Sequence, residues 1–453
     1  MTGRKPPTTI CRRFFNYNTL LPPPIILVKS APLQQNIFSF VTKITYLCIS
    51  FEKTPVKAPV KASMKTLKHM APKLLKALGI TILAFILSTV LMRPFSFSAS
   101  AFLSNPEKSD FAITDFYSIV ADSRPVRTID DDIVVINLNG LDREGIAQVL
   151  ELMPLLSPAA VGLDVAFVEP RDNDSRLLAA IAGCPNLVMP VALNQNSGNG
   201  RFSLGEISFF ADSTARHVPL GATNLPTRYA KSTIREFRTF FPINHSIVNY
   251  TDSIPSFVVA VAQTARPSLA EVLARRGNTL EMINYPSRSF RIFNPEEIAG
   301  NAHLMAGKIL LLGDTDDLAD MHATPVTSTM SGVMIHAHAL STIIHNGYLD
   351  SFTKAQNLTL AFALCLIIVL TSVMLPIGIK GLIMRIMQVA FLYFAVRLGY
   401  SLFLDHNMVI DFSYALLMLA FGLFACDIWI GLTNIWLGLR RRYRKLVAAR
   451  AQL

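Results

Sequence analysis

The positions of apolar residues along the chain predict two kinds of structure. Four long apolar stretches come close to the ~20 residues that a helix needs to cross ~30 Å of hydrocarbon. Between the first and the second stretch, short apolar runs alternate with segments whose apolar residues recur at helical spacing. We therefore expect a folded domain between membrane helices. The expected spans cover residues 74–92, 356–379, 386–404 and 408–434.

The alternation between residues 95 and 353 predicts an α/β domain with a mainly parallel central sheet. A continuous β-branched run such as Ile133–Leu138 is typical of a strand that is buried on both faces. Residues 200–300 are less regular and predict further strands and hairpins, for example at 279–285. The main predicted strands cover 133–138, 161–167, 187–193 and 308–313, and the predicted helices cover 142–156, 174–182 and 332–345.

Composition and charge placement support a membrane location. Hydrophobic residues make up 51% of the chain and charged residues 16%, whereas about 25% is usual for soluble domains. Basic residues crowd positions 57–76 before the first span and Arg440–Lys445 after the last one. By the positive-inside rule the tails 1–73 and 435–453 are cytoplasmic, and the domain 95–353 lies outside. We expect a multi-pass protein of the cell inner membrane.

The N-terminal part allows alternatives. Ala99–Ala101 fits a signal-peptide cleavage pattern, but the long apolar run before it favours an uncleaved anchor. Residues 1–63 show no sustained period, and Met64 opens a basic stretch typical of the start of a signal anchor. We expect translation to start at Met64 or Met70, with a genuine cytoplasmic tail as the alternative.

Motifs of catalysis and cofactor binding are absent from the sequence. It contains no GxGxxG, P-loop, HExxH, GxSxG or CxxC pattern, so we expect neither an enzyme nor a cofactor. Basic stripes interleaved with aromatic residues are also missing from the domain, so nucleic acid is not an expected partner. Several histidines lie near aspartates in residues 303–345, but His336 and His338 are two apart on a predicted helix. Their side chains point in different directions, so we expect no metal site.

Candidate site residues follow the predicted strands. Ligands of open parallel sheets collect at the carboxyl ends of the strands, where Asn137, Asn139, Asp164 and Asp314 are expected. Asp164 lies in an apolar run, and a buried carboxylate is costly unless it is paired or hydrogen-bonded. It is either a ligand-facing acid or a carboxylate that ties backbone amides of a neighbouring loop. The candidates for ligand binding or for a structural motif are Asp164, Asp314, Asp320, His322, Thr324 and His336.

These segments together resemble the CHASE type 2 family of sensory extracellular domains over about residues 110–350. The resemblance rests on the stretches 124–127 (RPVR), 132–140 (DIVVINLNG), 161–170 (VGLDVAFVEP) with Asp174, Asn284-Tyr285 and 307–338. Its closing stretch is the most specific, with Asp320, His322, Thr324 and Pro325. The layout of one helix before the domain and three after it also agrees. The chain departs from the family in a shortened segment after the first strand and in the absence of a catalytic output domain.

The resemblance implies a membrane-anchored sensor or receptor subunit that detects an envelope or extracellular signal. Residues 440–453 are too few for an output domain, so we expect relay to a separate cytoplasmic or membrane protein. A non-signalling envelope scaffold is the alternative. A transporter is favoured only by Arg397 inside the third span, where Asp427 is a candidate counter-ion; snorkelling of Arg397 to the interface is equally compatible. The ligand is an unknown small molecule or envelope component, and the oligomeric state stays open, a homodimer included.

Overall fold

The structure is a computed structural model that describes most of the chain from residue 70 onward. The expected cytoplasmic tail, the start at Met64, the cleavage pattern at 99–101 and the stretch 124–127 lie outside the described residues. The described ranges are 70–90, 112, 114–123, 128–172, 174–195, 200–207, 218–226, 233–247, 249–375 and 380–450.

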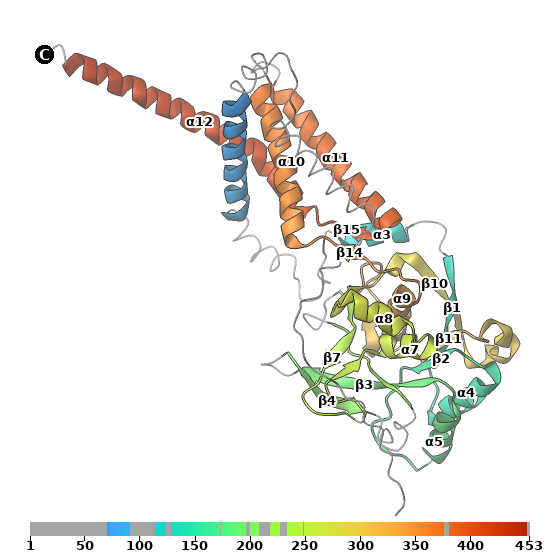
Figure 1. Cartoon of the computed structure of the whole chain (residues 1–453). Helices are drawn as coiled ribbons and strands as arrows, with labels where there is room; N and C mark the ends of the chain where they lie inside the picture. The colour runs from blue at the N-terminus through green and yellow to red at the C-terminus, as the bar shows by residue number, and fades with distance from the viewer. Residues whose placement is uncertain are drawn as a thin grey trace, which may run out of the picture. The chain divides into compact units, whose positions relative to one another are not determined.

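A seven-stranded sheet forms the centre of the domain (Figure 1). Its strand order is β10-β1-β11-β2-β3-β4, and β5 also pairs with β3, outside this linear order. Every pairing in it is parallel except the antiparallel pair β3–β4. The predicted mixed α/β class with a mainly parallel sheet is therefore confirmed. The strands are β1 (Thr128–Asn137), β2 (Ala160–Leu163), β3 (Leu187–Gln195), β4 (Phe202–Ile207), β5 (Leu220–Ala222), β10 (Arg288–Phe293) and β11 (Ile309–Gly313).

Helices cover both faces of this sheet because the side chains of a strand alternate between its two faces. Val134 and Ile136 of β1 pack in one core with α4 (Arg143–Leu156) and α5 (Asp174–Gly183). Ile133 and Val135 pack in a second core with α7 (Phe257–Ala265) and α9 (Gly332–Ile344). Both faces of β1 are thus apolar, which explains its continuous β-branched run.

Strand β2 ends earlier than the sequence predicts. The predicted strand at 161–167 is wrong beyond Leu163, although the N–H of Asp164 still donates to the Leu312 carbonyl at 2.8 Å. The apolar run continues because Phe167 is buried in the first core from a loop. Asp164 therefore follows the strand and does not lie within it.

The irregular part of the domain contains short strands. β6 (Glu236–Arg238) pairs with β9 (Leu280–Met282), and β7 (Phe240–Pro242) pairs with β8 (Ser253–Pro255), both antiparallel. Two further two-stranded pairs lie outside this region. Their bounds are β12 (Met321–His322) with β13 (Met330–Ser331), and β14 (Asp350–Ser351) with β15 (Met408–Val409). The remaining helices of the domain are α3 (Asp115–Asp122) and α8 (Leu269–Arg276), with 3-10 turns at Tyr285–Ser287, Pro295–Glu297, Ala299–Leu304 and Leu318–Asp320.

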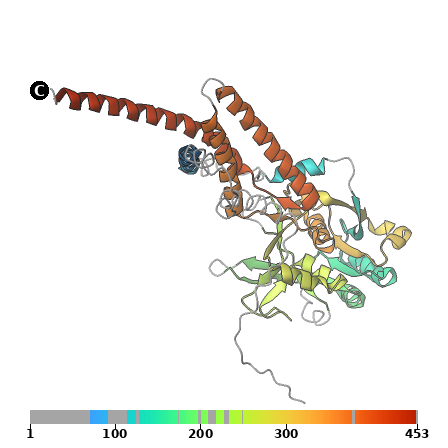
Figure 2. The ribbon, with the colours of Figure 1, turned by 45° about the horizontal axis from the view of Figure 1, so that its top comes forward.

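Four helices of the described chain are long and apolar enough to cross a membrane, as expected for a membrane protein. The last of them, α12, continues as one helix in both views (Figures 1 and 2). It begins at Ser413, later than the predicted 408, because Met408–Val409 pairs as β15 with β14. The four helices are Met70–Val90, α10 (Lys354–Met374), α11 (Lys380–His406) and α12 (Ser413–Arg450).

Candidate functional site

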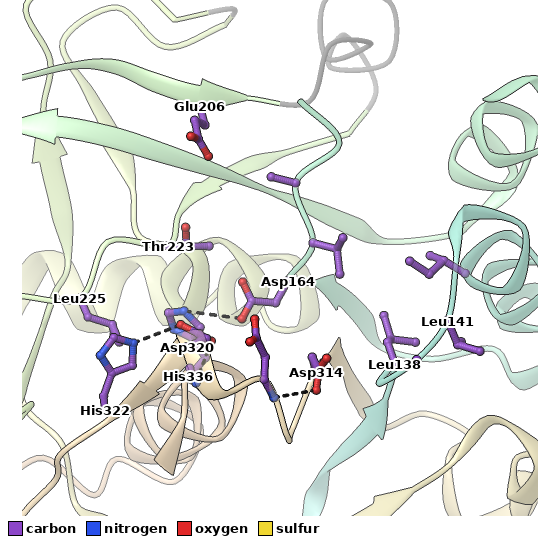
Figure 3. A pocket seen from close by; sticks show the side chains of 16 residues that line it. Leu138, Leu141, Asp164, Glu206, Thr223, Leu225, Asp314, Asp320, His322 and His336 are labelled. Atoms are coloured by element: carbon purple, nitrogen blue, oxygen red, sulfur yellow. Dashed lines mark hydrogen bonds and ion pairs between the residues drawn. The ribbon is translucent and has the colours of Figure 1, made fainter. Parts of the chain in front are cut away.

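A cavity of about 690 Å³ lies at the carboxyl ends of the parallel strands β1, β2 and β11 (Figure 3). Its wall includes the residues that follow these strands, the first two turns of α9, and side chains from β4 and the segment after β5. Five candidates from the sequence line it together: Asp164, Asp314, Asp320, His322 and His336. The topology brings these residues together because parallel strands end at one edge of the sheet.

The Asp164 carboxylate and the His336 imidazole face each other in this cavity (Figure 3). Oδ2 of Asp164 lies 3.9 Å from Nε2 of His336, which is longer than a hydrogen bond. His336 packs against Phe257 with ring centroids 5.3 Å apart. Burial raises the pKa of Asp164 above its ordinary value, and the nearby His336 offsets part of this effect. No hydrogen bond between described residues reaches the Asp164 carboxylate, so it does not tie the amides of a loop there.

The Asp320 side chain links the segment before α9 to the first residue of that helix. Its Oδ2 accepts from the Gly332 N–H at 3.0 Å, and its Oδ1 lies 3.1 Å from Nε2 of His322. A carboxylate at the N-terminus of a helix also interacts favourably with the helix dipole. A Cβ at position 332 would overlap the Asp320 carboxylate, so any side chain there would displace Asp320 from the Gly332 N–H. Asp320 thus links His322 to the start of α9 in the cavity wall, and we refer to Asp320, His322 and Gly332 together as the clamp.

Thr324 lies beyond this clamp and orders the next turn. Its hydroxyl donates to the Thr327 carbonyl at 3.1 Å and accepts from the Thr327 N–H at 3.2 Å. Its side chain is not part of the cavity lining that the structure describes. We assign Thr324 an architectural contact rather than a place at the cavity.

The loop after β11 is held by its own polar side chains. Asp314 accepts from the N–H groups of Asp316 and Asp317, at 2.8 and 3.0 Å. The Thr315 hydroxyl donates to Asp316 at 2.9 Å and, with Asn137 and Asn139, lowers the pKa of that carboxyl. These bonds fix the loop at the edge of the cavity.

Sequence reasoning missed two polar lining residues, Glu206 of β4 and Thr223. Both come from the irregular region, where neither spacing nor composition indicates which residues face the sheet edge. Asp317, which also lines the cavity, belongs to the acidic run 314–317 that the sequence places at the end of the strand β11. Glu206 makes the cavity more acidic than predicted.

The lining is strongly acidic among the residues that the structure describes. It holds the carboxylates of Asp164, Glu206, Asp314, Asp317 and Asp320 and no lysine or arginine. Within the described ranges, no group of three or more His, Cys, Asp or Glu side chains is arranged to hold a metal ion. The described lining of the cavity therefore concentrates negative charge.

Arg397 and Asp427 lie away from this cavity, on α11 and α12. Both side chains are exposed on the described helices, and no ion pair between described residues joins them. The structure thus supplies no contact for an intramembrane relay through this pair.

A chain of contacts leads from the cavity wall to the membrane helices. The carbonyl of Ala323, next to His322, accepts from the Ile234 N–H at 2.8 Å. The neighbouring Arg235 donates to both carboxylate oxygens of Asp115 in α3, at 2.8 and 2.7 Å. The ring of Tyr117, also in α3, stacks on Phe403 of α11. Helix α3 therefore contacts the domain and the helix α11 at once.

Helix α9 provides a second connection, since it begins at the cavity and is followed by β14 and α10. Its last turn is fixed by the fully buried Asp130, whose Oδ2 accepts from Ser341 at 2.7 Å and lies 2.9 Å from His345 Nε2. Asn284, from the stretch that resembles the family's Asn-Tyr element, donates to the Gly347 carbonyl at 3.1 Å. Helix α9 is therefore held at its last turn by Asp130, and the segment between α9 and β14 is held by Asn284.

Comparison with known proteins gives one family match. A protein-family model described as CHASE2 domain matches residues 83–375, more than half of the chain. No curated protein and no solved structure matches the chain. The matched range contains the whole described domain with the cavity and extends through α10.

Proposed function

The chain belongs to the CHASE2 domain family of sensory extracellular domains, and from this premise we propose that it is a membrane-anchored sensor subunit. The domain lies outside the cytoplasm, binds a ligand in the cavity at the sheet edge, and relays the binding event through the membrane helices to a separate protein. The observation that carries this proposal is the chain of contacts from His322 through Arg235 and Asp115 to Tyr117 and α11.

A ligand shifts a protein only if it binds one conformation better than another. The clamp of Asp320, His322 and Gly332 is suited to this role because it forms part of the cavity wall and also holds the start of α9. The ion pair of Arg235 with Asp115 is largely buried, with side chains 20% and 5% exposed, so its geometry is fixed. Movement of the cavity wall therefore moves α3, because the contacts between them are largely buried and not solvent-exposed.

The inner end of the relay is α12. Its C-terminal half carries exposed Trp436, Leu439 and Tyr443 beside Arg440. Exposed aromatic and basic side chains are common at protein interfaces. This segment is the surface that we propose contacts the output protein. An envelope scaffold remains the second candidate, and it requires no change at α3 when the cavity changes.

Amide hydrogen exchange of the full chain in lipid nanodiscs tests the relay without knowledge of the ligand. Asp164→Asn removes one of the five cavity carboxylates, and Asp172→Asn removes an exposed carboxylate that forms no hydrogen bond or ion pair with other described residues. We expect Asp164→Asn to change the exchange of α3 and of the Asp350 and Phe352 amides, which donate to Asn407 and Val409. Asp172→Asn should change neither. Exchange that changes only around the cavity would favour the scaffold.

A further inference from the structure

We propose that the cavity takes a small organic cation with a primary ammonium group, held between Asp164 and His336. The inference rests on the proposed sensory function, because it names the chemistry of the ligand that the same cavity binds. It goes beyond the family assignment, which identifies a sensory domain and no ligand.

The first observation is a buried imidazole without a hydrogen bond. His336 is only 6% exposed and lines the cavity, yet no hydrogen bond reaches its imidazole from any described residue. Its Nε2 lies 3.9 Å from Asp164 Oδ2. Polar groups as buried as this one normally have a partner. A nitrogen at about 2.8–3.0 Å from both atoms, the usual length of such bonds, fits this separation.

Asp164 Oδ2 and His336 Nε2 favour a ligand group that donates hydrogen bonds to both of them. A carboxylate only accepts hydrogen bonds, and a neutral imidazole offers one accepting nitrogen. An ammonium group has three donors and no acceptor, so it can bond to Asp164 and His336 and retain one donor for another lining carboxylate. A hydroxyl has a single donor and cannot satisfy both atoms.

The second observation is the charge of the wall. Asp164, Glu206, Asp314, Asp317 and Asp320 line the cavity without a lysine or arginine among the described lining residues. Among the described lining residues, His322 is the basic side chain within hydrogen-bond distance of one of these acids, at 3.1 Å from Asp320. Such a wall repels anions and attracts cations. The ligand is thus a cation.

Size and geometry distinguish an organic cation from a metal ion. A volume of about 690 Å³ lies in the ordinary range for small-molecule sites. No three potential metal ligands are gathered around one point in the described chain. Asp314 and Asp317 instead accept hydrogen bonds from backbone N–H groups. The acidic side chains are spread along the cavity wall, which suits an organic molecule that carries one or more ammonium groups on a carbon chain.

The test compares four-carbon probes that differ only in their end groups. Putrescine is the diammonium probe, 1,4-butanediol the neutral one and succinate the anion, with ethanolamine as a second ammonium probe and MgCl2 as the metal. We measure the thermal midpoint and the Kd of the purified full chain in nanodiscs. Because a ligand of the folded state raises the midpoint, we expect an increase with putrescine or ethanolamine and none with the other three.

Variants locate the binding. Asp164→Asn should weaken ammonium binding about tenfold or more, the usual effect of losing a charged hydrogen bond. Glu206→Gln, at an exposed position whose side chain forms no hydrogen bond or ion pair with other described residues, should weaken it about two- to fivefold. Asp172→Asn should leave it unchanged. Glu206→Gln keeps the test decisive if Asp164→Asn does not fold.

The proposal is overturned if neither ammonium probe raises the midpoint, if 1,4-butanediol, succinate or MgCl2 does so, or if both cavity variants bind ammonium like the unmutated chain. The exchange experiment on α3 uses no ligand. If α3 responds to Asp164→Asn but the ammonium probes do not bind, the ligand proposal is wrong and the sensory function is still supported. Ammonium binding without a response of α3 would reject the relay alone.

Discussion

The ring of Tyr117 in α3 stacks on the ring of Phe403 in α11, with centroids 5.9 Å apart and planes at 23°. The Tyr117 hydroxyl also donates to the Ile410 carbonyl, just after β15, at 3.3 Å. Aromatic pairs contribute about 0.5–1.5 kcal/mol beyond their buried area. This pair joins the sensory domain to a membrane helix, so its packing can be tested directly.

Gly399→Ala should loosen this contact. A Cβ at Gly399 would overlap the Tyr117 hydroxyl and the Phe412 ring, and overpacking of this kind costs about 1–3 kcal/mol. We expect a lower thermal midpoint of the full chain and faster amide exchange in α3. Gly431→Ala in α12 is the matched control, because a Cβ there meets nothing within 4 Å. Equal midpoints for the two variants would show that Tyr117 is not held at this position.

Asp320→Ala should destabilise the domain by removing the acceptor for the Gly332 N–H and the partner of His322. The Asp320 side chain is 48% exposed, so we expect a loss near the middle of the range for helix caps, about 1 kcal/mol. The corresponding fall of the midpoint is about 2–4 °C for a chain portion of this size. Asp172→Ala is the control and should leave the midpoint unchanged.

The same variant separates an architectural role from a binding role of the clamp. An unchanged midpoint together with lost binding of an ammonium probe would make Asp320 a ligand contact rather than a clamp. A metal role makes a different prediction, since a chelator would then lower the midpoint of the unmutated chain. We expect EDTA to have no effect.

Much of this architecture could be predicted from the sequence because its strands are buried on both faces. β1, β3 and β11 read as continuous apolar runs, and their parallel pairing places Asp164 and Asp314 at one edge. The end of β2 could not be predicted, since Phe167 is buried from a loop and prolongs the apolar pattern.

Contacts between distant segments could not be predicted from the sequence either. Strand β4 places Glu206 at the cavity although its short region has no clear period. Tyr117 precedes the sheet in the sequence and Phe403 follows the domain. No local sequence pattern therefore indicates that their rings stack. The pairing of β14 with β15 likewise depends on two residues from each segment.

The proposed placement of the domain outside the cytoplasm can be tested by fusions with alkaline phosphatase, which is active only after export. The basic residues before the first helix and at Arg440–Lys445 predict which segments stay inside. A fusion after residue 200 should be active, and fusions after residues 382 and 453 should be inactive. An inactive fusion at 200 with normal expression would place the cavity in the cytoplasm and remove the basis of an extracellular sensor.

Asp164→Asn should stabilise the unliganded chain at neutral pH. Burial raises the pKa of Asp164 in the folded state above that of an unfolded aspartate, about 3.9. Between these two pKa values the folded state binds more protons than the unfolded state, so the free energy of unfolding falls as pH rises through this window. The loss is complete above the folded-state pKa and absent below the unfolded one.

The asparagine variant lacks this titration, so its advantage over the unmutated chain should appear only as pH rises from about 4. Chemical unfolding of both chains across pH 3.5–8 measures the difference, and Asp172→Asn should show none. A variant that is less stable than the unmutated chain at pH 7 would mean that the Asp164 carboxylate has a stabilising partner in the unliganded protein. Added putrescine should reverse the order at pH 7, because its ammonium group would form a charged hydrogen bond with Asp164, which His336 at 3.9 Å is too distant to provide.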